Sequence, residues 1–256
     1  MIRIQNLSKS YGAQPAVRDI SLEIPGGQLV GLLGPNGAGK TTTIRMLTGM
    51  LAPSSGTAEV EGFDVVRQPL EVKRLVGYVP ESGALFEALT AHEYLRFVAS
   101  LYHLTENEAD RKIAQFAEFF DLDAATLHDK RLSAYSKGMR QKVVITSALL
   151  HNPKVVFFDE PLNGLDANAA LAFKTLITSL ARDGKTILYC SHILDVVERV
   201  CERVVIIHEG RIVADGSAQE LEAQTGEATL ERVFNRLTAT ENLLARAEEF
   251  ARALSQ

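Results

Sequence analysis

Residues 34–42 read Gly-Pro-Asn-Gly-Ala-Gly-Lys-Thr-Thr, and this stretch decides the fold class. It fits the phosphate-binding pattern G-x-x-x-x-G-K-[ST]. The residues of the stretch are Gly34, Pro35, Asn36, Gly37, Ala38, Gly39, Lys40, Thr41 and Thr42. An apolar run at 28–33 predicts a buried strand before the stretch, and the segment 41–50 predicts a helix after it. Strand, glycine loop and helix in this order form a polyphosphate-binding arrangement.

Each part of this arrangement has a chemical role. Glycines let backbone N–H groups converge on phosphate oxygens, and a helix N-terminus favours negative charge. We expect Lys40 to reach the β- and γ-phosphates, and the Thr41 hydroxyl to help hold magnesium. The alternative is a glycine-rich turn with an incidental lysine. It is the weaker reading, because the flanking strand and helix agree with the motif.

The rest of the chain alternates between predicted strands and helices. Alternating residues at 2–4 and 17–24 predict antiparallel strands joined near residues 11 and 12. Further strands are predicted at 57–62, 75–79, 154–158, 186–190, 204–208 and 211–214, with helices at 167–182 and 193–200. The segment 89–150 has a helical pattern throughout. This order predicts an α/β fold with a mostly parallel sheet and an inserted helical block.

A second motif lies at 155–160, Val-Val-Phe-Phe-Asp-Glu. Four apolar residues followed by two acids describe a buried strand that delivers carboxylates at its carboxyl end, the edge at which such sheets bind ligands. Asp159 suits a role on magnesium, and Glu160 suits the polarisation of a water for attack on the γ-phosphate. Acids at a solvated strand end are common, so the motif gains its meaning from the glycine loop upstream.

Four smaller features have both an ordinary and a functional interpretation. Ser136 is a predicted N-cap whose hydroxyl could bind phosphate, and Asp166 is a second cap candidate. His192 follows a predicted strand and could contact the γ-phosphate, although a histidine there is more often a surface residue. Tyr11 could stack on a purine, or it could simply occupy a turn.

Composition excludes several classes of protein. The net charge of −5 argues against broad electrostatic binding to nucleic acid, and no nucleic acid is expected as a partner. The two cysteines, Cys190 and Cys201, have no metal-site or disulfide spacing, and Cys190 is expected to be a buried, inert thiol. The N-terminus does not look like a signal peptide, and no apolar run approaches the ~18–20 residues that span a bilayer. We expect a soluble cytoplasmic chain.

Together these pieces resemble the nucleotide-binding subunit of ABC transporters, over residues 1–238. The stretch 34–42 matches the Walker A motif, and Phe158, Asp159 and Glu160 match Walker B with its catalytic glutamate. The signature motif is matched, in a variant form, by Ser136, Lys137, Gly138 and Met139. Asp166 matches the D-loop, His192 the switch histidine and Tyr11 the aromatic residue that stacks on adenine.

The resemblance implies a fold, cofactors and partners. It implies a P-loop NTPase (RecA-like) core at 1–87 and 147–222 that includes an antiparallel β subdomain. It also implies an inserted helical subdomain at 88–146 and a C-terminal helical extension at 223–256. The cofactors would be ATP and Mg²⁺. Two copies, or this chain and a homologous ATPase subunit, would pack head to tail around two ATP. An integral-membrane permease would hold the pair on the inner face of the cell membrane and couple ATP hydrolysis to transport.

Two departures from the family pattern concern the site. Glu81 follows the Gly-Tyr-x-Pro turn, where the family usually has a glutamine that contacts magnesium and the attacking water. A carboxylate can ligate magnesium, but it adds negative charge beside the γ-phosphate. The signature carries Lys137 and Met139 in place of the usual Gly and Gln. These variants and the segment 229–238 are similar to bacterial subunits that work with separate permeases, many of them exporters.

Other interpretations remain open at this point. A soluble ABC-type ATPase acting on nucleic acid or the ribosome is the first alternative, although such proteins usually carry long coiled coils or two cassettes. A metabolite kinase sharing only the glycine loop is the second. The segment 241–254 predicts a helix that packs on its own domain or at a subunit interface. The permease is expected to dock on the helical insertion and the Glu81 loop, near Leu85, Phe86, Tyr94 and Phe97.

Overall fold

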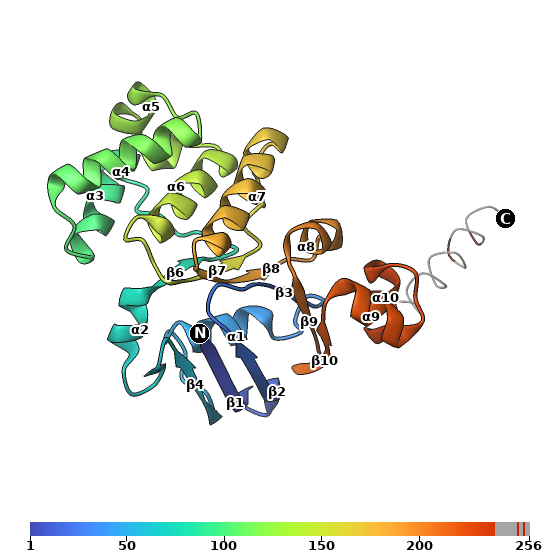
Figure 1. Ribbon diagram of the computed structural model, residues 1–256. Helices are drawn as coiled ribbons and strands as arrows, with labels where there is room; N and C mark the ends of the chain where they lie inside the picture. The colour runs from blue at the N-terminus through green and yellow to red at the C-terminus, as the bar shows by residue number, and fades with distance from the viewer. Residues whose placement is uncertain (239–249, 251–252, 254–256) are drawn as a thin grey trace.

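The computed structural model describes residues 1–238, 250 and 253, and contains two β-sheets (Figure 1). The first sheet has the strand order β2-β1-β4-β5 and is antiparallel throughout. Its strands are β1 (Ile2–Tyr11), β2 (Gln14–Ile24), β4 (Ser55–Val60) and β5 (Phe63–Asp64). The predicted N-terminal antiparallel hairpin is confirmed, with both strands longer than the sequence pattern indicates.

The second sheet has the order β10-β9-β3-β8-β7-β6. Its strands are β3 (Leu29–Leu33), β6 (Val76–Val79), β7 (Val155–Asp159), β8 (Thr186–Cys190), β9 (Arg203–His208) and β10 (Arg211–Gly216). All neighbours are parallel except the edge pair β9–β10. Every residue of β3, β7 and β8 is buried, as expected for parallel strands covered on both faces. The predicted mostly parallel α/β fold is therefore confirmed.

The helices surround the two sheets (Figure 1). The bounds are α1 (Lys40–Leu47), α2 (Pro69–Leu75), α3 (Ala91–Leu101), α4 (Glu106–Phe119), α5 (Ala124–Asp129), α6 (Lys137–Leu149), α7 (Ala167–Arg182), α8 (Leu194–Val200), α9 (Ala218–Thr225) and α10 (Leu230–Leu237). Helices α3 to α6 gather on the side of the parallel sheet away from the antiparallel sheet. They have an apolar core of their own, centred on Leu95, Ile113, Leu132 and Val143. Helices α9 and α10 follow β10 at the far end of the molecule.

Local sequence signals account for several helix starts. Thr90, Thr105 and Ser217 each form a capping box with a glutamate three residues later, so two backbone donors are satisfied at each start. The sequence analysis did not predict α2, most of α9 or the two-residue strand β5, because short elements carry too few residues for a clear period. Helix α10 lies within the C-terminal helical extension that the family resemblance implies at 223–256. The helix predicted at 241–254 lies outside the described residues, apart from residues 250 and 253.

Candidate active site

The glycine loop connects β3 to α1 and is packed too tightly for side chains at two of its positions. A Cβ at Gly34 would lie 2.4 Å from the carbonyl oxygen of Ile207 on β9. Gly39 has φ 107°, and a Cβ there would lie 2.6 Å from the carbonyl oxygen of Ala16 on β2. Gly39 is therefore needed for its positive φ and for lack of space, and Gly34 for lack of space alone. This packing holds the loop at the carboxyl end of β3, where α1 begins.

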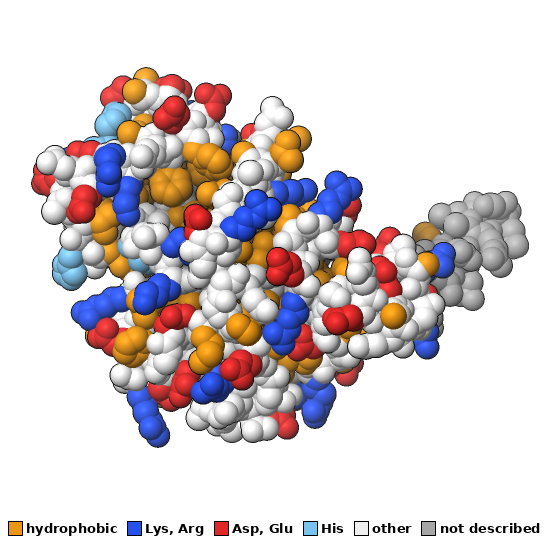
Figure 2. All heavy atoms as spheres, viewed as in Figure 1, with side chains coloured by type: hydrophobic (Ala, Val, Ile, Leu, Met, Phe, Trp, Pro, Cys, Tyr) orange, Lys and Arg blue, Asp and Glu red, His pale blue; other side chains and the backbone are white. Residues whose placement is uncertain are grey.

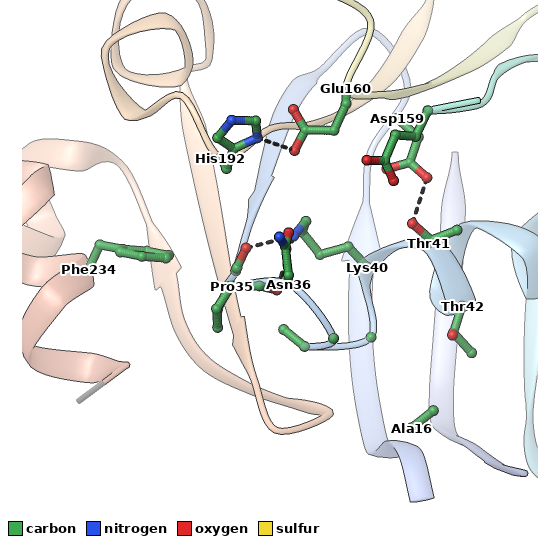
Figure 3. A pocket seen from close by; sticks show the side chains of 15 residues that line it. Ala16, Pro35, Asn36, Lys40, Thr41, Thr42, Asp159, Glu160, His192 and Phe234 are labelled. Atoms are coloured by element: carbon green, nitrogen blue, oxygen red, sulfur yellow. Dashed lines mark hydrogen bonds and ion pairs between the residues drawn. The ribbon is translucent and has the colours of Figure 1, made fainter. Parts of the chain in front are cut away.

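A cavity of about 590 Å³ opens over this loop (Figure 3). Its lining comes from β2, the loop and α1, the segment after β6, the end of β7, the segment after β8, and α10. The lining residues are Ala16, Gly34, Pro35, Asn36, Gly37, Ala38, Gly39, Lys40, Thr41, Thr42, Glu81, Asp159, Glu160, His192 and Phe234. The structure thus gathers the whole predicted loop, both predicted acids, the predicted histidine and Glu81 around one cavity.

Lys40 is a buried cation held by the loop itself. Its ammonium donates to the carbonyl oxygens of Gly34, at 2.6 Å, and Pro35, at 3.2 Å. An ammonium group has three donors and no acceptor, so a further donor remains for an anion in the cavity. The loop carbonyls also fix the side chain, which reduces the conformational entropy that phosphate binding would cost.

Asp159 is fully buried at the end of β7, and its Oδ2 accepts a 2.7 Å hydrogen bond from the Thr41 hydroxyl. Burial raises the pKa of this carboxyl; the Thr41 hydrogen bond lowers it, and the charges of Glu81 and Glu160 raise it further. Within the described part of the chain, Oδ1 has no hydrogen-bond partner. A buried carboxylate with an unsatisfied oxygen beside a hydroxyl suits a hard divalent cation. Among the described residues, no cluster of three or more Asp, Glu, His or Cys side chains could hold a metal ion. A cation at Asp159 would therefore need ligands of other kinds as well.

Glu160 and His192 are in direct contact in the wall of the cavity (Figure 3). The His192 Nδ1 lies 2.8 Å from Glu160 Oε1, with the carboxylate side chain 7% exposed and the imidazole 59% exposed. The Ser191 hydroxyl donates to Glu160 Oε2 at 3.4 Å. Glu160 has φ 52°, an unusual value for a residue other than glycine, which costs on the order of 1 kcal/mol. The backbone strain and both contacts turn this carboxylate into the cavity.

The residues that resemble the signature motif lie at the start of α6, outside the cavity. Ser136 caps α6, its Oγ accepting from the Met139 amide at 3.2 Å. None of the residues Ser136, Lys137, Gly138 and Met139 lines the cavity of this same chain. A Cβ at Gly138 would lie 2.4 Å from the carbonyl oxygen of Gly164, so α6 packs directly on the segment that follows Glu160.

Three more contacts hold that segment, 161–166, in place. The Gln141 side chain, from α6, donates to the carbonyl oxygen of Pro161 at 3.0 Å. Asp166 caps α7 by accepting from the Ala169 amide at 2.8 Å, and it lies 3.8 Å from the Lys142 ammonium. Helix α6 and the carboxyl end of β7 are therefore connected through one short stretch of backbone.

Tyr11 and Phe234 show where sequence reasoning and structure differ. Tyr11 is exposed at the end of β1, with the Lys9 ammonium 5.7 Å from its ring centroid, and it does not line the cavity. Its role in adenine binding stays a prediction. Phe234 lines the cavity and was not among the predicted site residues. No local pattern could have placed it, because it lies far from the loop in the sequence.

The two cysteines have no part in the site. Both are buried, and burial raises the pKa of Cys190 well above its ordinary value and that of Cys201 to about 12. A thiol that stays protonated is a poor nucleophile, so the expected inert character of Cys190 agrees with its surroundings.

Asp159→Asn is expected to stabilise the fold while abolishing hydrolysis. Asparagine keeps an acceptor for Thr41 and removes a carboxylate whose pKa burial raises. Because the raised pKa makes the folded state bind a proton more readily than the unfolded state, the wild type loses stability as pH rises above the ordinary carboxyl range. The gain on substitution should be largest near neutral pH and shrink as pH falls.

We expect a rise in melting temperature of roughly 2–4 °C at pH 7, equivalent to about 1 kcal/mol. Thermal unfolding at pH 4 to 8 measures it, with Asp195→Asn on the exposed face of α8 as the matched control. A melting temperature that falls at pH 7 would contradict this account of Asp159.

The fold and the cavity define a P-loop nucleoside triphosphatase site: a glycine loop, a buried lysine, an aspartate paired with the loop threonine, and a strained glutamate. The family model described as ABC transporter matches residues 17–163. The chain is 41% identical over 221 residues to the ABC transporter ATP-binding protein NatA of Bacillus subtilis, covering 86% of this chain and 89% of NatA.

Two further comparisons agree with these. The linearmycin resistance ATP-binding protein LnrL of the same organism is 35% identical, covering 90% of this chain and 73% of LnrL. A solved structure titled as the ATP-binding subunit of an ABC transporter aligns with a TM-score of 0.86 at 34% identity, covering 93% of this chain and 99% of that one. The chain belongs to the ABC transporter family, whose ATP-binding domains bind and hydrolyse ATP.

Proposed function

We propose that this chain is the ATP-hydrolysing motor subunit of an ABC transporter, working as a head-to-tail pair around two ATP and driving a separate membrane permease that exports its substrate. The observation that carries the pairing is the position of the signature residues. Ser136 and Gly138 belong to the site by family resemblance, yet they do not line the cavity of their own chain. A second copy of the chain, or a homologous ATPase subunit, would bring them over the γ-phosphate.

Within one cavity, each group of residues has a separate role in ATP binding or hydrolysis. Lys40 and the loop amides bind the phosphates, and the buried ammonium offsets their charge. Thr41 and Asp159 would hold Mg²⁺, with Glu81 as a further candidate; the ion would neutralise charge on the phosphate oxygens. Glu160 orients a water and accepts its proton as the water oxygen attacks the γ-phosphorus and ADP leaves. His192 holds the Glu160 carboxylate at 2.8 Å, in position to act on that water.

The pairing has a simple electrostatic basis. The γ-phosphate carries charge that the N-terminus of α6 and Ser136 of the second copy are placed to bind. Bound ATP therefore favours closure of the pair, and cleavage to ADP and phosphate removes the shared ligand. In this proposal the chain has a core at 1–87 and 147–222, a helical subdomain at 88–146 and a C-terminal extension at 223–256.

The permease would dock where aromatic side chains are exposed on the helical insertion and on the Glu81 loop that precedes it. Phe86 is 59% exposed and Phe97 44%, with ring centroids 5.7 Å apart. The Tyr94 ring centroid lies 6.1 Å from that of Phe86, and Tyr94 and Leu85 are both partly buried against the apolar core of the helical group. No described helix is long and apolar enough to cross a membrane.

Export is the direction supported by the resistance function in the name of LnrL, a relative of this chain. The alternative is a soluble ABC-type ATPase acting on nucleic acid or the ribosome. On the face drawn in Figure 2, Lys and Arg side chains are interspersed with Asp and Glu, a distribution more typical of an ordinary surface than of a nucleic-acid footprint. This favours the motor function.

Co-expression with the neighbouring gene tests the proposal. We expect an adjacent reading frame with about six bilayer-length hydrophobic spans. Membrane fractions should retain this chain only when that product is co-expressed, and the detergent-extracted pair should hydrolyse ATP faster than the chain alone. Phe86→Ser with Phe97→Ser should lose retention but keep the basal ATPase rate. Co-sedimentation with ribosomes, or stimulation by RNA or DNA instead, would favour the soluble alternative.

A further inference from the structure

The C-terminal helix α10 is part of the wall of the active-site cavity. Leu230 and Val233 are fully buried and belong to the same apolar cluster as Val196 and Val197 of α8. Arg236 donates to the carbonyl oxygen of Thr225 at 2.7 Å and so ties α10 to the end of α9. Helix α10 is therefore firmly packed on the core, although α9 and α10 form a separate lobe in Figure 1.

Phe234 projects from this helix into the cavity (Figure 3). Among the described residues that line the cavity, its ring is the only aromatic hydrocarbon surface; the other lining side chains are small, polar or charged. Figure 3 places it on the side of Pro35 and His192, whereas Thr42 and Ala16 lie beyond Lys40 on the opposite side. The phosphates are expected between Lys40 and Glu160, so Phe234 lies toward the hydrolytic end.

Helix α10 also contacts the element that begins beside His192. Helix α8 starts at Leu194, two residues after His192, and α10 packs against it. The Ile193 amide donates to the Ser191 hydroxyl at 3.0 Å, and that hydroxyl donates to Glu160. A side chain on α10 can thus influence the Glu160–His192 pair in two ways: directly across the cavity, and through α8.

We propose that Phe234 is a positioning residue for ATP hydrolysis. Its ring forms the apolar wall at the terminal-phosphate end of the cavity and holds the segment of His192 in place through α10 and α8. Phosphoryl transfer depends on such positioning, because the groups that act on the attacking water must be held in a productive geometry. The inference rests on the proposed function only in taking ATP as the ligand of this cavity.

Substitutions at Phe234 test the role in catalysis. Phe234→Ala should lower kcat about tenfold, less than the roughly 10²-fold that a 1 Å misplacement of reacting groups can cause, while the Kd for ATP changes less than about threefold. Phe234→Leu, which keeps an apolar wall, should recover most of the rate. Arg232→Ala, on the exposed face of α10, is the matched control and should behave as wild type. Val233→Ala shows what loss of helix packing alone does to the melting temperature and the rate.

The chain contains no tryptophan, so Phe234→Trp introduces a single fluorescent probe at the cavity. With EDTA to prevent turnover, ATP should shift the emission more than ADP does, at a midpoint independent of protein concentration. Phe119→Trp, on α4 outside the cavity, should respond to neither nucleotide.

Three results would overturn the inference about Phe234. The first is an equal kcat for Phe234→Ala and wild type. The second is an emission from the Phe234→Trp variant that does not respond to nucleotide, and the third is a response of that variant that develops only as protein concentration rises. The third result would assign Phe234 to the contact between copies. Wild-type protein that binds no ATP would instead contradict the proposed function, so the two failures are distinguishable.

Discussion

Glu160→Gln is expected to lower ATP turnover by about 10³-fold, within the range that general-base residues contribute. Glutamine keeps the shape of the side chain but cannot accept the proton of the attacking water. ATP binding should persist, because in the proposed function Lys40 and the loop bind the phosphates and Glu160 does not. The bound ATP then remains intact, and the variant should accumulate as a closed pair. Sizing with ATP and magnesium measures the pair, and phosphate release measures turnover.

The matched control is Glu198→Gln, an identical change on the exposed face of α8. It should turn over ATP as wild type does and show no ATP-stabilised pair. A strictly monomeric Glu160→Gln protein with full activity would contradict both the role of this carboxylate and the pairing.

Gly138→Ala is expected to lower the ATPase rate by about 10²-fold, the loss that roughly 1 Å of misplacement can cause, with little change in the Kd for ATP. The added methyl group would lie 2.4 Å from the carbonyl oxygen of Gly164, a separation at which backbone must move. The displaced groups belong to the start of α6 and to the segment after Glu160, and neither lines the cavity over the glycine loop. Steady-state ATPase assays and binding of a fluorescent ATP analogue separate the two effects.

Gly26→Ala serves as the control, because a Cβ at Gly26 meets nothing within 4 Å. Its rate and melting temperature should match those of the wild type. The strongest contrary outcome would come from Ser136→Ala combined with Gly138→Ala: an undimerised protein that still splits ATP at the wild-type rate would exclude a site shared between copies.

The sequence predicted the phosphate loop and the acidic strand because their signals are local. Parallel strands buried on both faces appear as continuous apolar runs, and β3 and β7 are both of this kind. The glycine loop follows β3 directly, and Asp159 and Glu160 lie at the end of β7. Once the two strands were predicted, the positions of the loop and of the two carboxylates followed. The pairing of Glu160 with His192 was not predicted, since it requires β7 and β8 to lie side by side.

Features that depend on distant segments were beyond the sequence pattern. Phe234 reaches the cavity because α10 packs against α8, a contact that no periodicity of the short helix encodes. The contact of Gly138 with Gly164 likewise requires the helical insertion to fold back on the parallel sheet.

Glu81 was predicted beside the phosphates, and it lines the cavity near Asp159, whose pKa its charge helps to raise.

The backbone between Glu160 and α7 has a mechanical consequence. It is clamped to α6 by Gln141 and by the close approach of Gly138 to Gly164, so it cannot shift alone. In the proposed pair, the start of α6 that contacts the partner's ATP would therefore move together with Glu160 of its own chain. Cleavage of one nucleotide would then change the binding of the other. We expect cooperative hydrolysis, with a rate that rises more steeply with ATP concentration than a hyperbola.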